Sequence, residues 1–215
     1  MTDDLIPWPA YTDGSKFTDK ITLDHTTVLD YLDAPAALPL RHTVANIIAA
    51  HGCKTVVDVG CGVGRMSSFI DVDSYMGFDD DIRLIRKAVN QYANDKTSFR
   101  VASWKDTDEI QVDYPVDCLL LLGVLSYAMP EYPAIYDKNG FHRDVWDSLI
   151  KLYKPKLVIV QEILADQTHV AETNELQVLP LDYYKSLPHV YHELDLPIWC
   201  GHRAILEIDT TTIKE

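Results

Sequence analysis

Cysteine is scarce in this chain of 215 residues, and its four copies lie far apart in the sequence. They are Cys53, Cys61, Cys118 and Cys200, and no two of them form a Cys-x-x-Cys pair. This spacing argues against a metal site built from cysteines and against a disulfide framework. Three of the four lie in or beside segments that we expect to be core strands. We therefore interpret them as reduced thiols that behave as small apolar side chains.

Long apolar runs are also missing, since none reaches the roughly 18 residues that a membrane-spanning helix needs. Residues 1–5 are acidic and lack the basic region and apolar stretch of a secretory signal. We therefore expect a cytoplasmic protein with no membrane partner. The apolar content of 47% and the absence of repeats fit a single domain. Within residues 1–215 we expect an N-terminal arm at 1–37 and an α/β core at 38–215.

Positive charge is in short supply: 19 lysines and arginines stand against 33 aspartates and glutamates, a formal net charge of -14. Nucleic-acid binding depends largely on contacts between phosphates and basic side chains. So acidic a chain is a poor candidate for a nucleic-acid substrate. A local basic groove is still compatible with this charge balance.

Glycine is uncommon as well, but three glycines alternate in the stretch Thr55-Val-Val-Asp-Val-Gly-Cys-Gly-Val-Gly-Arg65. The valines leave no polar face, which is typical of a strand buried on both sides of a parallel sheet. Asp58 interrupts that strand, and a carboxylate there is costly unless it accepts hydrogen bonds or faces a ligand. Gly60, Gly62 and Gly64 then permit positive φ and a close approach of the backbone to a ligand.

A second acidic residue, Asp79, ends the next expected strand, which covers residues 74–78. The tip of the second strand lies beside the loop that follows the first. A carboxylate at this position is well placed to accept both hydroxyls of a ribose bound over the glycine loop.

Together, Asp58-x-Gly60-x-Gly62-x-Gly64 and Gly77-Phe78-Asp79 resemble the class I S-adenosylmethionine-dependent methyltransferases. The nearest alternative is the dinucleotide fingerprint G-x-G-x-x-G, whose third glycine lies one position later because that loop must hold a pyrophosphate. The structural alternative is a tight strand-to-helix turn with an incidental aspartate. The alternating glycines, with an acid at the end of each strand, favour the methyltransferase.

The resemblance implies a doubly wound, Rossmann-like α/β fold with a mostly parallel sheet and a C-terminal antiparallel hairpin. Its first strand should lie near the centre of the sheet. Hydrophobic patterning predicts strands at 54–59, 74–78, 99–102, 116–124, 157–163, 189–192 and 203–208, and helices at 38–51, 64–70, 81–93, 141–153 and 181–187. In the helix at 81–93, the spacing predicts that Ile82, Ile85, Val89 and Tyr92 cover the sheet. We expect the N-terminus of the helix at 64–70 to face the carboxylate of the cofactor.

The resemblance also implies the cofactor, S-adenosyl-L-methionine, and its product, S-adenosyl-L-homocysteine. Its cofactor-binding residues in this sequence would be Asp58, Gly60, Cys61, Gly62, Gly64, Asp79, Asp80, Ser103, Trp104 and Leu122. Ser103 departs from the acidic residue that the family commonly uses to hold the adenine amino group; serine is a weaker acceptor, and Asp106 is an alternative. Trp104 would either stack on adenine or serve as ordinary hydrophobic cover.

Two aromatic-rich segments are candidates for the acceptor pocket. The leader contributes Trp8, Tyr11 and Phe17, and the loop after the fourth strand contributes Tyr127, Tyr132 and Tyr136. The leader aromatics would either cover the acceptor or only fix the arm to the core. Methyl transfer makes a general base optional, and the candidates for catalytic groups are His142 and Tyr127, with His202 as a weaker one.

We therefore predict an enzyme that methylates the oxygen or nitrogen of a small molecule. Two other functions stay open: methylation of a protein or nucleic acid, and a catalytically inactive cofactor-binding subunit. The Asn- or Asp-Pro-Pro-aromatic tetrad of methyltransferases that act on exocyclic amines is absent after the fourth strand. This absence lowers the expectation for a nucleic-acid base as the acceptor.

Overall fold

The computed structural model describes residues 38–104, 108–123, 138–163, 189–194 and 203–212. The predicted arm at 1–37 and the predicted helix at 181–187 lie outside these ranges. The strands are β1 (Thr55–Val59), β2 (Ser74–Asp79), β3 (Thr97–Val101), β4 (Cys118–Leu122), β5 (Leu157–Ile163), β6 (His189–Leu194) and β7 (Arg203–Asp209). The helices are α3 (Leu38–Ala50), α4 (Ile82–Tyr92) and α5 (Lys138–Tyr153), with 3₁₀ turns η3 (Arg65–Ser68) and η5 (Thr210–Thr212).

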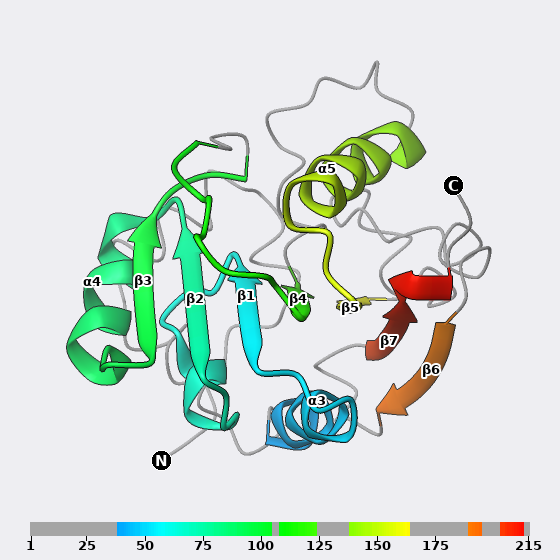
Figure 1. Ribbon diagram of the computed structural model, residues 1–215, viewed down its shortest axis with the longest axis horizontal. Helices are drawn as coiled ribbons and strands as arrows, with labels where there is room; N and C mark the ends of the chain where they lie inside the picture. Colours follow the sequence, from blue (N-terminus) through cyan, green and yellow to red (C-terminus); the bar gives the residue numbers. More distant parts are fainter. Residues whose placement is uncertain (1–37, 105–107, 124–137, 164–188, 195–202, 213–215) are drawn as a thin grey trace, which may run out of the picture.

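The strands form one sheet in the order β3-β2-β1-β4-β5-β7-β6, so β1 lies near its centre (Figure 1). β1 to β5 pair in parallel, whereas β7 is antiparallel to both of its neighbours, β5 and β6. This arrangement confirms the predicted doubly wound sheet with its C-terminal antiparallel hairpin. It also places the loops after β1, β2, β3 and β4 at one edge of the sheet, where ligands of such folds bind.

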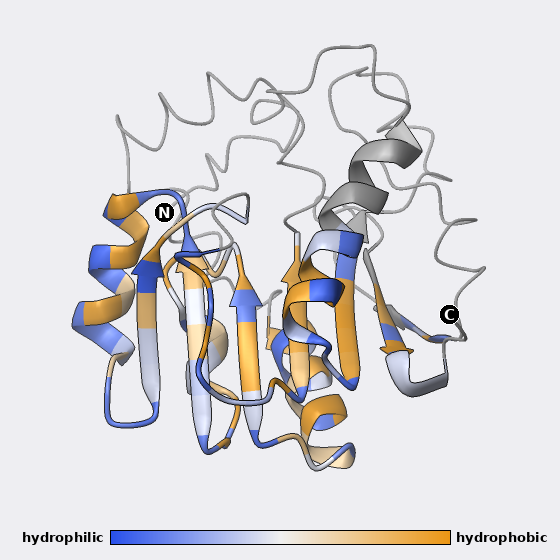
Figure 2. Cartoon of the chain, turned by 45° about the horizontal axis from the view of Figure 1, so that its top comes forward, coloured by the Kyte–Doolittle hydropathy of each residue, from blue (hydrophilic) through white to orange (hydrophobic). Residues whose placement is uncertain are grey.

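Two apolar layers enclose the sheet, with α3 and α4 on one face and α5 on the other (Figure 1). Side chains alternate between these layers along β1: Val57 and Val59 face α5, while Val56 faces α3 and α4. By the same alternation, Asp58 points into the layer of α3 and α4. Figure 2 shows the apolar residues concentrated along the central strands, with hydrophilic residues in several of the connecting turns. Within the described ranges, no helix has the length and apolar character needed to cross a membrane.

The predicted face of α4 is confirmed for Ile85 and Tyr92, which pack on the core layer, and is wrong for Ile82 and Val89. Ile85 and Ala88 are buried, whereas Ile82 is 48% exposed and Val89 is 43% exposed. The reason is the close approach of the loop after β1: an added Cβ at Gly64 would lie 3.0 Å from the Cβ of Ala88. The helix therefore turns Ile85 and Ala88 toward the sheet, with the small Ala88 beside the loop, while Ile82 and Val89 face outward.

The helix predicted at 64–70 is wrong in length, since η3 is a single 3₁₀ turn. Two serines in it bond to their own backbone, with Ser67 Oγ donating to the Gly64 carbonyl at 2.7 Å and Ser68 Oγ donating to the Arg65 carbonyl at 2.8 Å. Such local bonds compete with the continuation of a helix. A turn this short has little dipole, so the electrostatic role predicted for its N-terminus has no support.

Candidate cofactor site

The loop that follows β1 is folded tightly against the end of β2. All three of its alternating glycines have positive φ, at 66° for Gly60, 56° for Gly62 and 74° for Gly64. The amide of Cys61 donates to the carbonyl of Phe78 on β2 at 3.0 Å, and the amide of Gly64 donates to the Cys61 carbonyl at 2.9 Å. The backbone of the loop is thus fixed at the carboxyl edge of the sheet.

Close packing beneath the loop requires glycine at two positions. A Cβ on Gly64 would lie 2.5 Å from the ring of Phe99 on β3, and a Cβ on Gly77 would lie 2.8 Å from both Phe99 and the thiol of Cys61. Neither distance is possible for a real side chain without displacement of its neighbours. Phe99 therefore supports the loop from below, and Gly77 provides the space for the Cys61 side chain.

Asp79 connects the glycine loop after β1 to the residues that begin α4. Its Oδ2 accepts a hydrogen bond from the amide of Gly62 at 3.0 Å, and its Oδ1 accepts one from the amide of Asp81 at 2.9 Å. Burial raises the pKa of Asp79 to about 6, although both backbone donors oppose this shift. Each carboxylate oxygen keeps a second lone pair, so Asp79 can accept further hydrogen bonds from a ligand.

The two aspartates after Asp79 differ in their surroundings. Asp80 is exposed. Asp81 caps α4, because its carboxylate accepts from the amide of Arg83 at 2.8 Å and pairs with the Arg83 guanidinium at 2.5 Å. This ion pair lowers the pKa of Asp81. Of the three consecutive acids, only Asp79 is both fixed and turned toward the glycine loop.

Asp58 is 3% exposed and accepts a hydrogen bond from the hydroxyl of Tyr75 on β2. Burial raises the pKa of Asp58 to about 7, and the nearby charge of Asp79 adds to the shift. The bond from Tyr75 acts in the opposite direction, because it favours the ionised form. Asp58 is therefore a buried carboxyl that titrates near neutral pH, directly below the loop.

Three further residues of the predicted site lie at, or just after, the ends of strands at the same edge of the sheet. Ser103 and Trp104 follow β3, and both are half-buried. Trp104 packs against the apolar layer of α5, and its contact with adenine stays a prediction. Leu122 is the last residue of β4 and packs on the opposite layer. The structure thus brings these residues to the edge that carries the glycine loop and Asp79.

Several predicted residues lie outside the described part of the chain and stay predictions. These are Trp8, Tyr11 and Phe17 of the arm, Tyr127, Tyr132 and Tyr136 of the loop after β4, Asp106, and His202. His142 belongs to α5, but its side chain is not described.

Sequence reasoning missed Tyr75 and Phe99, the two aromatic residues that support the site from below. Their rings are 5.9 Å apart in an edge-to-face arrangement. A signal was present in Gly77, because a glycine inside a strand often marks close approach by another group. Gly77 lies directly opposite Asp58 in the register of β1 and β2.

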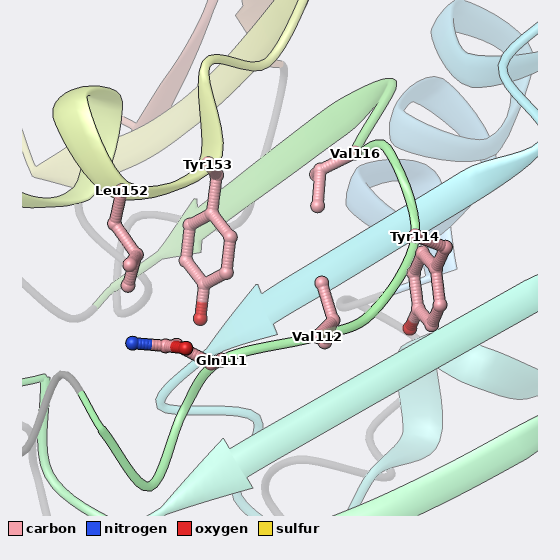
Figure 3. Close-up of a pocket in the computed structure, with 6 residues that line it drawn as sticks. All are labelled: Gln111, Val112, Tyr114, Val116, Leu152 and Tyr153. Atoms are coloured by element: carbon pink, nitrogen blue, oxygen red, sulfur yellow. The ribbon is translucent and has the colours of Figure 1, made fainter.

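A cavity of about 290 Å³ lies elsewhere, at the amino ends of β4 and β5. Figure 3 shows Leu152 and Tyr153 pointing from the end of α5 toward the segment that carries Gln111. The hydroxyl of Tyr153 donates to the carbonyl of Ile110 at 2.6 Å. The glycine loop follows the carboxyl end of β1, so this cavity is separate from the candidate cofactor site.

A scan against models of protein families and a search of curated protein sequences found no match to this chain. Solved structures do match. The N-methyltransferase NodS from Bradyrhizobium japonicum WM9, in complex with S-adenosylhomocysteine, has a TM-score of 0.63 and 12% identity over 82% of this chain and 88% of that one.

Two other matches are methyltransferases as well. Magnesium protoporphyrin IX methyltransferase (ChlM) from Synechocystis PCC 6803, with bound S-adenosylhomocysteine, has a TM-score of 0.58 and 16% identity over 81% of this chain and 83% of that one. The plantazolicin methyltransferase BpumL, in complex with a monoazolic desmethylPZN analog and S-adenosylhomocysteine, has a TM-score of 0.60 and 12% identity over 94% of each chain. The strand order and these likenesses show that the chain has the fold of the class I S-adenosylmethionine-dependent methyltransferases.

Proposed function

We propose that this protein is an S-adenosylmethionine-dependent methyltransferase that acts on an oxygen or nitrogen of a small molecule. The observation that carries the proposal is the position of Asp79, whose carboxylate is fixed against the amide of Gly62 at the end of β2. The solved structures of the same fold that bind S-adenosylhomocysteine support this choice of cofactor.

The residues of the loop fit such a cofactor. A Cβ added at Gly62 would meet no atom of the described residues within 4 Å, so this part of the chain leaves space above the loop beside the carboxylate of Asp79. A ribose in this space would donate its hydroxyls to Asp79, while the alternating glycines let the rest of the ligand lie close to the backbone. The half-buried Trp104 and Leu122 would provide apolar contacts along the same edge.

When bound, S-adenosylmethionine supplies an activated methyl group on a sulfonium, which the acceptor displaces in line. The chain must then hold the two reactants in alignment and exclude water. Asp79 and the glycine loop would fix the cofactor end. The acceptor would be held by the leader and the tyrosine-rich loop predicted from the sequence, with His142 or Tyr127 available to take a proton.

Two observations favour a small acceptor. The net charge of -14 is unsuited to a polyanionic substrate. Among proteins of this fold, ChlM acts on magnesium protoporphyrin IX and BpumL was solved with a desmethylPZN analog. The proposal keeps the cytoplasmic location predicted from the sequence.

Calorimetric titration tests the cofactor assignment. We expect the wild type to bind S-adenosylhomocysteine with one site per chain, and Asp79→Ala to bind it more weakly by about 1.5–3 kcal/mol, the range for hydrogen bonds to a charged group. Asp73→Ala is the matched control, because Asp73 is an exposed aspartate at the opposite end of the same strand. Equal affinities in all three proteins would remove Asp79 from the site.

Measurement of S-adenosylhomocysteine release against a panel of acceptors tests the activity. Turnover with a small hydroxyl or amine compound supports the proposal. Turnover only with a protein or nucleic acid would show that the acceptor is a macromolecule and not a small molecule. Tight cofactor binding with no turnover on any acceptor would instead identify a cofactor-binding subunit.

A further inference from the structure

The hydrogen bond between Tyr75 and Asp58 connects two strands diagonally. In the register of β1 and β2, Tyr75 lies opposite Val56 and Asp58 lies opposite Gly77. The hydroxyl of Tyr75 therefore reaches two residues along the sheet to meet the carboxylate, within the usual reach of a diagonal aromatic contact. The Cys61 thiol and the Phe99 ring occupy the space beside Gly77. Together with Tyr75, the Cys61 thiol and the Phe99 ring bury the carboxylate of Asp58 below the loop.

In the described part of the chain, few groups near Asp58 change charge near neutral pH. Among the residues that the structure describes, the titratable groups that interact with it are Tyr75 and Asp79 on β2, Cys61 in the loop and Cys118 on β4. Burial raises the pKa of the tyrosine and of both thiols, so these three are uncharged at pH 7. Of the groups named, only the two aspartates titrate between about pH 6 and 7.

A buried carboxylate is costly unless hydrogen bonds or an opposite charge compensate its lost hydration. Tyr75 supplies one hydrogen bond, and Asp79 adds a second negative group instead of a positive one. Two acids below a ligand loop therefore create a region that favours a cation. S-adenosylmethionine carries two positive groups, the sulfonium and the ammonium of its methionine part.

We propose that Tyr75 is a positioning residue that keeps Asp58 ionised below the glycine loop, so that this buried carboxylate attracts the positively charged methionine end of the cofactor. The inference rests on the proposed function, since it assumes that the loop binds S-adenosylmethionine. Tyr75 itself does not contact the ligand. It acts through Asp58, and its removal should change how cofactor affinity depends on pH.

The direction follows from the protonation of Asp58. Below pH 7 the carboxyl is mostly neutral, so the affinity for the cofactor falls as the pH drops through about 7. The hydrogen bond from Tyr75 favours the ionised form, so its loss raises the pKa of Asp58 further. In Tyr75→Phe the fall in affinity should therefore occur at a higher pH than in the wild type.

The experiment is calorimetric titration of S-adenosylhomocysteine between pH 5.5 and 8.5 with the wild type and Tyr75→Phe. For a pKa rise of roughly one unit, binding by the variant is about 5-fold weaker at pH 7 and within about 2-fold of the wild type at pH 8.5. The fall near pH 6 that belongs to Asp79 should stay in place. Phenylalanine keeps the ring that packs on Phe99, and thermal unfolding of the free variant checks that the fold is retained.

Tyr153→Phe is the matched control, because it removes another buried tyrosine hydroxyl that is bonded to a carbonyl at the opposite edge of the sheet. Its pH profile should match that of the wild type. Asp58→Asn provides a second test that does not depend on Tyr75→Phe folding. In that variant the fall in affinity near pH 7 should disappear, and binding at pH 8.5 should be weaker than in the wild type.

The outcomes separate the inference from the function on which it rests. If the wild type binds no S-adenosylhomocysteine at any pH, the proposed function fails. If the wild type binds but Tyr75→Phe keeps the wild-type pH profile, the role of Tyr75 is refuted. If Asp58→Asn keeps the inflection near pH 7, Asp58 is not the group that attracts the cofactor.

Discussion

Replacement of Asp58 by asparagine should make the free protein more stable, and the gain should increase with pH. Burial raises the pKa of Asp58 from 3.8 to about 7 in the folded protein. A pKa raised by folding means that the stability from this group is fully present below 3.8 and is lost as the pH rises through about 7. Asparagine carries no charge, so the variant does not lose stability in this interval.

The magnitude follows from the size of the shift. Each pKa unit corresponds to about 1.4 kcal/mol, so a rise from 3.8 to about 7 costs the wild type roughly 4 kcal/mol at pH 8 and roughly 1.5 kcal/mol at pH 5. The hydroxyl of Tyr75 can still donate to the amide oxygen of asparagine, so the hydrogen bond survives the change. The advantage of Asp58→Asn should therefore grow by about 2.5 kcal/mol between pH 5 and pH 8.

Urea unfolding at 25 °C, followed by circular dichroism at both pH values, measures this difference in the free energy of unfolding. Asp73→Asn serves as the control, because Asp73 is exposed and its change should have the same small effect at both pH values. An advantage of Asp58→Asn that is equal at pH 5 and pH 8 would refute the reasoning, and so would a loss of stability at pH 8. A carboxylate that weakens the fold in this way is typical of residues retained for binding or catalysis.

Other changes should give equally specific results. Asp79→Asn should remove the fall in S-adenosylhomocysteine affinity that the wild type shows as the pH drops through about 6, measured by calorimetry; a persisting fall would assign it to another group. Gly64→Ala should lower the free energy of unfolding by about 1–3 kcal/mol, because its Cβ would lie 2.5 Å from Phe99 at a φ of 74°. An unchanged urea midpoint would contradict that contact. Deletion of residues 1–20 should abolish turnover more than it weakens S-adenosylhomocysteine binding, and full activity of the truncated chain would show that the acceptor enters elsewhere.

The sheet was predictable from the sequence because its strands carry strong local signals. The β-branched valines around Asp58 and the short apolar run of β4 both favour strands, and the limits of β5 match the predicted 157–163. The order of the strands came from the resemblance and not from local patterning. The structure confirms it, with β1 near the centre of the sheet.

One error concerns a tertiary contact of α4, and the other concerns local hydrogen bonds that end a helix. Ile82 and Val89 fit a helical apolar face, yet they are exposed, and α4 contacts the sheet through Ile85 and the small Ala88, which lies beside the glycine loop. The helix predicted after the loop ends after one turn because Ser67 and Ser68 bond to their own backbone. The spacing of apolar residues along the sequence carries no information on either effect.

The site itself was only partly visible in the sequence. The glycines and Asp79 carry a spacing that can be read directly, and the structure brings Asp79 to the loop by a bond to Gly62. The contact between Tyr75 and Asp58 cannot be read in this way, because it depends on the register of two strands.

A crystal structure of the protein with S-adenosylhomocysteine is the most direct test that the glycine loop and Asp79 form the cofactor site. We expect the ligand over Gly60, Gly62 and Gly64, with both ribose hydroxyls donating to the carboxylate of Asp79. A ligand bound elsewhere, such as in the cavity at the amino ends of β4 and β5, would contradict this account, as would a ribose without contact to Asp79.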